Sequence, residues 1–182
     1  MRNRKYQIVS RDKAVILILF ALAIAGGSIA IWYHYDQGRY VRVLWGPAAA
    51  STVRNSQHVE LLVLDPTRVP PDLSDTTWPD WLASAVTARH DLTAARGLIH
   101  VRHALLVDAS YEQPVSSSAS SPHWHYALHF IRQADPPTYV LLDLEDRWLA
   151  VSSTGQRARL GVAMASGLRR WLSESAPQKL GQ

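Results

Sequence analysis

A run of twenty uncharged and mostly apolar residues, Ala14–Tyr33, lies directly behind a basic N-terminus. An α-helix rises about 1.5 Å per residue, so a helical run of this length covers roughly the 30 Å hydrocarbon core of a bilayer. The sequence therefore predicts a transmembrane helix over residues 14–33, with the lipid bilayer as its partner. On this interpretation the chain is a single-pass membrane protein.

The distribution of basic residues predicts the orientation of this helix. Five of the 19 lysine and arginine residues precede the run, ending at Lys13, and only one acidic residue opposes them. Because basic segments beside a span stay on the cytoplasmic side, we expect residues 1–13 to form a cytoplasmic tail. Trp32, Tyr33 and Tyr35 fit the outer headgroup boundary, opposite Lys13. The predicted localisation is the cell membrane, with the C-terminal domain periplasmic or extracellular.

Two other interpretations of the apolar run remain open. Ala23-Ile24-Ala25 resembles the cleavage site of a secretory signal peptide, but apolar residues resume after it, which favours an uncleaved signal anchor. Gly26, Gly27 and Ala30 are small residues that permit two helices to approach closely. They are candidates for helix pairing, and this defines a third class of function, a structural membrane protein that acts through its span.

Charge balance argues against nucleic acid as a partner. The whole chain has a formal net charge of +4, but the basic excess lies before the apolar run. The remaining 14 basic and 14 acidic residues cancel, and we find no clustered basic stripe or nucleic-acid module. The basic character therefore indicates membrane topology, and we expect no nucleic-acid binding.

The residues after the span predict one small α+β domain. Six of the seven tryptophans lie there, which is typical of a packed core. We expect a juxtamembrane connector over 34–57, an extracytoplasmic domain over 58–176 and a flexible C-terminus over 177–182. Alternating and β-branched runs predict a mainly antiparallel sheet, with two helices packed on one face. The expected strands are 58–64, 98–108, 123–131, 138–144 and 147–152, and the expected helices are 77–96 and 160–173.

The run from Leu98 to Asp108 fits two periods. Its alternating apolar residues favour a strand, whereas Leu98, Val101 and Leu105 also recur at helical spacing. Gly97 before the run and Pro114 after it favour the strand. We therefore assign residues 98–108 to the sheet and keep the helix as the alternative.

Four histidines form the main candidate site for chemistry. His123, His125 and His129 alternate on one side of the predicted strand 123–131, and His100 is expected on a neighbouring strand. Imidazole nitrogens at such spacing bind zinc or copper in proteins. The alternative is that these histidines are exposed polar residues opposite a buried aromatic face, and the sequence favours this alternative.

Other polar clusters predict little chemistry. Asp143, Glu145 and Asp146 read as a charged hairpin turn, and Arg169-Arg170 as solvated arginines on the last helix. No nucleophile elbow, phosphate-binding glycine loop or metalloprotease motif is present. A non-catalytic role is thus favoured: a membrane-anchored domain that binds or scaffolds protein partners in a cell-envelope complex. The alternative is an anchored metal-binding protein or hydrolase that uses the histidines.

Overall fold

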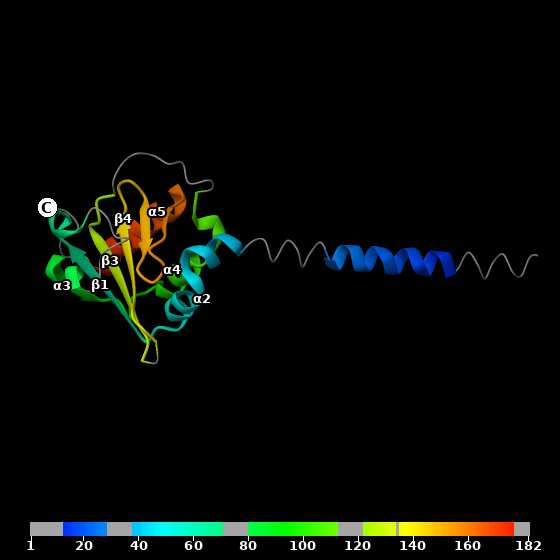
Figure 1. The fold of residues 1–182 in the computed structure, drawn as a ribbon, viewed down its shortest axis with the longest axis horizontal. Coiled ribbons are helices and arrows are strands. Elements are labelled where there is room, and N and C mark those ends of the chain that lie inside the picture. The colour runs from blue at the N-terminus through cyan, green and yellow to red at the C-terminus, as the bar shows by residue number, and fades with distance from the viewer. Residues whose placement is uncertain (1–12, 29–37, 71–79, 113–121, 134, 177–182) are drawn as a thin grey trace, which may run out of the picture. The chain divides into compact units, whose positions relative to one another are not determined.

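The computed structural model describes residues 13–28, 38–70, 80–112, 122–133 and 135–176 (Figure 1). The chain divides into two compact units, residues 1–39 and 40–182. In the first unit the structure describes one helix over residues 13–28. The second unit contains the sheet and all other described helices.

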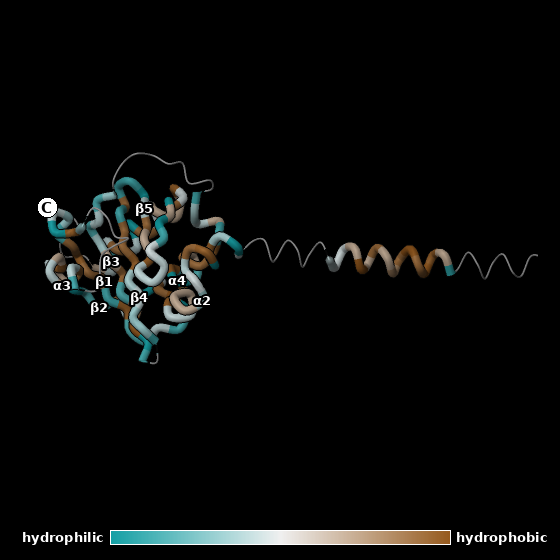
Figure 2. The backbone as a smooth tube through the Cα atoms, viewed as in Figure 1, coloured by the Kyte–Doolittle hydropathy of each residue, from teal (hydrophilic) through white to brown (hydrophobic). Residues whose placement is uncertain are grey.

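The structure contradicts the predicted transmembrane helix over Ala14–Tyr33. The described helix over residues 13–28 is apolar along most of its length (Figure 2). None of the helices in the described part of the chain combines the length and apolarity that a membrane crossing requires. The membrane fold class, the single-pass description and the cell-membrane localisation are therefore corrected.

The structure describes only some of the residues that were predicted to bound and pair this helix. Lys13 is the first of the described helical residues, whereas Ala30, Trp32, Tyr33 and Tyr35 lie outside the described residues. Gly26 and Gly27 lie within the helix, and a Cβ atom built on either has no neighbour within 4 Å. Nothing tests the predicted helix pairing, which remains a prediction.

The second unit is an α+β domain with an antiparallel six-stranded sheet among its described residues. The strand order is β2-β1-β3-β4-β5-β6, so the chain crosses from edge strand β2 past β1 to β3, and α4 lies in this connection. The elements are α2 (Arg39–Asn55), β1 (His58–Leu64), η1 (Pro66–Arg68), α3 (Asp80–Ala85), β2 (Val86–Asp91), α4 (Leu98–Leu105), η2 (Asp108–Ser110), β3 (Tyr126–Ile131), β4 (Thr138–Asp143), β5 (Trp148–Val151), β6 (Arg157–Arg159) and α5 (Val162–Ser175).

The segment 34–57, expected to be a connector, contains helix α2. A kink at Gly46, where φ is 67°, divides the helix, and Pro47 follows at a position where its missing N–H costs little. The Asp108 carboxylate accepts hydrogen bonds from the backbone N–H groups of Tyr40 and Val41 and so caps the helix. The buried residues of α2 are Val41, Leu44, Trp45, Ala49, Thr52 and Val53.

Helices α2, α4 and α5 cover one face of the sheet, which we call the helix face (Figure 1). Neighbouring strand residues point to opposite faces, so Leu61 and Leu142 join this core while Leu62 and Leu141 join the other. The buried Trp45 indole donates a hydrogen bond to the Tyr111 hydroxyl at 3.0 Å. That hydroxyl donates to the Leu105 carbonyl at 2.6 Å, which ties α2 to the end of α4.

The opposite face, which we call the α3 face, carries a smaller apolar cluster. Leu82 of the short helix α3 packs there with Trp124, Trp148 and the inward residues of β1, β3, β4 and β5. The prediction of two helices on one face therefore differs from the structure. Three helices cover the helix face, and α3 lies on the other.

Two predicted elements have a different secondary structure. The expected helix 77–96 ends at Ala85, and residues 86–91 form edge strand β2 instead. Residues 98–105 form helix α4 rather than a strand, with Leu98, Val101 and Leu105 buried. Gly97, with φ of 87°, precedes α4 in a left-handed conformation that favours glycine. The sequence of this segment fits both strand and helix spacing, and tertiary packing selects the helix.

Candidate functional site

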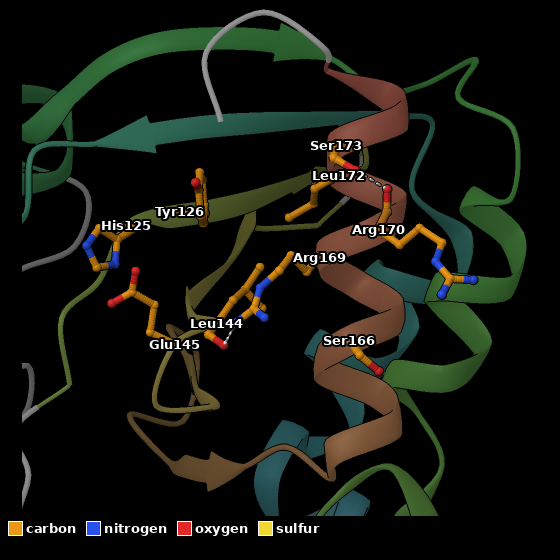
Figure 3. A pocket seen from close by; sticks show the side chains of 9 residues that line it. All are labelled: His125, Tyr126, Leu144, Glu145, Ser166, Arg169, Arg170, Leu172 and Ser173. Atoms are coloured by element: carbon orange, nitrogen blue, oxygen red, sulfur yellow. Dashed lines mark hydrogen bonds between the residues drawn. The ribbon is translucent and has the colours of Figure 1, made fainter. Parts of the chain in front are cut away.

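A cleft lies between helix α5 and the turn that joins β4 to β5, next to the start of β3 (Figure 3). Its volume is about 580 Å³, which is within the range of roughly 300–1,000 Å³ typical of ligand sites. The wall formed by α5 carries hydroxyl groups, arginines and one leucine, and the opposite wall carries an imidazole, a phenol and a carboxylate. The lining residues are His125, Tyr126, Leu144, Glu145, Ser166, Arg169, Arg170, Leu172 and Ser173.

A buried carboxylate organises the wall opposite α5. The side chain of Asp143, the last residue of β4, is almost fully buried and accepts hydrogen bonds from three backbone N–H groups. His123 donates to one oxygen at 2.9 Å, while Glu145 and Asp146 donate to the other at 3.0 and 3.1 Å. This carboxylate fixes the turn and the approach to β3 together and leaves the Glu145 side chain exposed. The sequence predicts a charged turn here, but not the burial of Asp143.

Arg169 reaches from α5 across the cleft. Its Nη2 donates a hydrogen bond of 2.6 Å to the Leu144 carbonyl, which holds the guanidinium against the β4–β5 turn (Figure 3). A guanidinium has five N–H donors, so this bond leaves others for a ligand. Arg169 forms no ion pair with any residue that the structure describes. Arg170, in contrast, points away from the cleft interior in Figure 3.

Tyr126 lies between the charged groups of the cleft. Burial raises the pKa of its phenol, the negative charge of Glu145 raises it further, and the positive charge of Arg169 lowers it. The hydroxyl therefore stays protonated at neutral pH and can donate a hydrogen bond. His125, also half-buried, points toward the Glu145 carboxylate in Figure 3. The cleft thus combines a phenol, an imidazole and charges of both signs.

The structure brings only one of the four predicted histidines into this cleft. His125 lines it, and His123 lies nearby in sequence with its backbone N–H on Asp143. His100 is exposed on α4 and not on a strand. No three His, Cys, Asp or Glu side chains are arranged to hold a metal ion in the regions that the structure describes. The zinc or copper site remains an untested prediction.

His129 belongs to a separate polar cluster on the α3 face. Its Nδ1 lies 3.0 Å from Glu60 Oε2, and its ring stacks on Tyr139 with centroids 4.3 Å apart. The neighbouring Glu60 carboxylate also lies 3.8 Å from Arg89 Nη1. The Nε2 atom of His129 is buried and has no hydrogen-bond partner among the described residues. A small hollow of about 50 Å³ beside it has room for only a few water molecules.

Sequence reasoning missed most of the cleft. The sequence marks Arg169 as a helix arginine and Glu145 as a turn carboxylate, but nothing in it indicates that they share a site. Its apolar pattern assigns Tyr126 and Leu172 only to packing. The available signal was weak: an arginine pair in the last helix and an acidic turn before β5.

No family model, no curated protein and no solved structure matches this chain. The assignment of function therefore depends on the geometry of the cleft.

Proposed function

We propose that the domain of residues 40–176 is a binding module without chemistry of its own, and that the α5 cleft is where it takes up a segment of a protein partner. The observation that carries this proposal is that Glu145 and Arg169 line one cleft without pairing with each other. Opposite charges held apart beside apolar side chains provide the few polar anchors and the apolar surface that recognition requires.

The rigidity of the cleft supports this proposal. The Asp143 hydrogen bonds hold one wall, and α5 is packed on the core through Leu168, Trp171 and Leu172. A preformed site loses little conformational entropy when a ligand binds. The residue types also argue against chemistry, because the lining serines lie exposed on α5, and Figure 3 shows no histidine directed at them.

Site-specific photocrosslinking tests this function. The photoreactive residue p-benzoylphenylalanine is placed at Ser173, which is exposed and lines the cleft, in the full-length chain in its producing cell. The matched control carries the same residue at Ala163, which is exposed on α5 outside the cleft lining. We expect a discrete adduct at position 173 that is absent or at least about tenfold weaker at position 163. A tenfold difference in binding corresponds to about 1.4 kcal/mol.

The identified partner is then purified and titrated against the full-length chain. Binding that weakens at least tenfold in the Arg169→Glu variant, but not in Arg54→Glu, supports the proposal. Arg54 is exposed in the last turn of α2 and does not line the cleft, so this variant controls for the same reversal of one charge. Equal adducts at positions 163 and 173, or unchanged affinity in Arg169→Glu, would contradict it.

A further inference from the structure

The charges of the α5 cleft are unequal as well as separated. Arg169 contributes a positive charge inside the cleft, Arg170 adds a second from a guanidinium that points away from the interior, and Glu145 contributes the one negative charge of the lining. The positive charges come from one helix, α5, and the negative charge comes from the β4–β5 turn opposite. The cleft therefore directs a negative group of a ligand toward α5.

The position of Arg169 makes it the anion-binding group. Its bond to the Leu144 carbonyl already restrains the exposed side chain, so part of the side-chain entropy is lost before an anion binds. Charge-assisted hydrogen bonds from a guanidinium to a carboxylate are roughly twice as strong as neutral ones. The hydroxyl of Tyr126 lines the same cleft and can act as a second donor to an anion.

The remaining lining defines what must flank the anion. Leu172 and Leu144 line the cleft but expose only 0% and 4% of their surface, whereas the half-buried ring of Tyr126 offers apolar surface in the same lining. An aliphatic side chain placed against this ring would lose its hydration without leaving a polar group unpaired. The Glu145 carboxylate on the far wall can accept a hydrogen bond from a backbone N–H of the same ligand.

We infer that the α5 cleft selects a peptide segment in which a side-chain carboxylate adjoins an aliphatic residue. The carboxylate binds Arg169 and the Tyr126 hydroxyl, the aliphatic side chain packs on the ring of Tyr126, and a backbone N–H of the segment donates to Glu145. This inference rests on the proposed function, because it names the chemistry of the partner at that same cleft.

Two capped dipeptides serve as the probes. Acetyl-Leu-Asp-methylamide carries the required carboxylate, and acetyl-Leu-Asn-methylamide has nearly the same shape without the charge. Each is titrated into the uniformly ¹⁵N-labelled full-length chain while the backbone amide signals of Glu145, Leu172 and Ser173 are followed by NMR. We expect the aspartate probe to shift these signals and to bind at least about tenfold more tightly than the asparagine probe, since one charge-assisted hydrogen bond accounts for such a ratio.

Three variants separate the contacts. In Arg169→Gln the preference for the aspartate probe should fall to about twofold or less, whereas Arg54→Gln should leave it unchanged. Tyr126→Phe keeps the ring in the cleft and should weaken the aspartate probe several-fold with little effect on the asparagine probe. Glu145→Gln keeps a hydrogen-bond acceptor but removes a negative charge, so it should tighten the aspartate probe several-fold. A residue with a merely structural role would not increase affinity when replaced.

The outcomes distinguish the two proposals. Equal affinity for both probes, with shifts confined to the cleft, would overturn carboxylate selection while leaving the cleft as a binding site. Shifts with neither probe, together with failed crosslinking at position 173, would overturn the proposed function as well. Displacement of the aspartate probe by an equal concentration of inorganic phosphate would show that the cleft binds anions without regard to the peptide, and this result would also overturn the inference.

Discussion

The two faces of the sheet are stabilised in different ways. The helix face is covered by α2, α4 and α5, and these helices are connected by buried hydrogen bonds such as those of Tyr111. The α3 face carries eight buried residues of its cluster under a six-residue helix, and beside them a polar row of Glu60, His129 and Tyr139. The difference indicates that the helix face defines the fold, whereas the α3 face tolerates polar groups and local rearrangement.

The largest expected effect compares one leucine from each face. Leu128 on β3 is fully buried in the helix-face core, and Leu62 on β1 is almost fully buried on the α3 face. Leu128→Ala should lower the free energy of unfolding by about 3–5 kcal/mol, because three fixed helices cannot collapse into the cavity. Leu62→Ala should cost about 2–3 kcal/mol, because the short α3 can shift to fill the space. Urea denaturation measures both, and equal losses would contradict the comparison.

A medium effect is expected at the hydrogen bonds that connect the helices. Tyr111→Phe keeps the ring but leaves the Trp45 N–H and the Leu105 carbonyl without the hydroxyl between them. The free energy of unfolding should fall by about 1–3 kcal/mol at neutral pH, the usual cost of buried polar groups that lose their partner. A loss below about 0.5 kcal/mol in urea denaturation would show that this network does not help to hold α2 and α4 together.

The same tyrosine predicts a response to alkaline pH. Burial raises the pKa of Tyr111 above its ordinary value, although the hydrogen bond from Trp45 acts in the other direction. Below pH about 10 the hydroxyl is protonated in both the folded and the unfolded chain. As pH rises further, the unfolded chain loses this proton first, so stability falls toward the folded-state pKa. Unfolding free energies measured between pH 8 and about 11 should therefore decline less steeply in Tyr111→Phe than in the unchanged chain.

The smallest effect is expected on the α3 face. His129→Phe removes the contact with Glu60 but keeps an aromatic ring against Tyr139, and it also removes a buried nitrogen that has no partner among the described residues. These changes oppose each other, so the free energy of unfolding should change by less than about 1 kcal/mol. Thermal and urea unfolding can measure the change. A fall in the free energy of unfolding of more than about 2 kcal/mol would mean that the α3 face tolerates substitution no better than the helix face.

Sequence patterns predicted the strands in which a run of apolar residues indicates burial. Strand β1 has the predicted bounds, 58–64, and β4 and β5 differ from their predictions by one or two residues. Their β-branched and leucine-rich runs stop at turn residues, which is a local signal. Helix α5 was also predicted, since Leu168, Trp171 and Leu172 recur at helical spacing.

The missed elements depend on contacts that no local pattern encodes. Strand β2 has few apolar residues and becomes a strand because it pairs with β1 at the edge of the sheet. Helix α2 carries Gly46 and Pro47, which suggested a connector, and its start is capped by the distant Asp108. The apolar run at 14–33 suggests a membrane span by composition, but none of the helices that the structure describes meets the requirements of length and apolarity for a span.

The cleft escaped prediction for a similar reason. Its two walls come from residues 125–145 and from α5, and only the packing of α5 onto the sheet brings them together. The histidines predict a candidate site because metal ligands recur at recognisable sequence spacings. The residues of a cleft that binds a peptide have no such characteristic spacing. Arg169 becomes informative only when its bond to the Leu144 carbonyl is known.

The three hydrogen bonds to Asp143 have a consequence for protein engineering. They hold the backbone of the β4–β5 turn through the Asp143 carboxylate, so the exposed side chain at position 145 takes no part in these bonds. Glutamine, lysine or tyrosine at that position should give proteins that express and fold alike while presenting different chemistry at the mouth of the cleft. A library of substitutions at this one residue would therefore change ligand preference while the scaffold stayed constant.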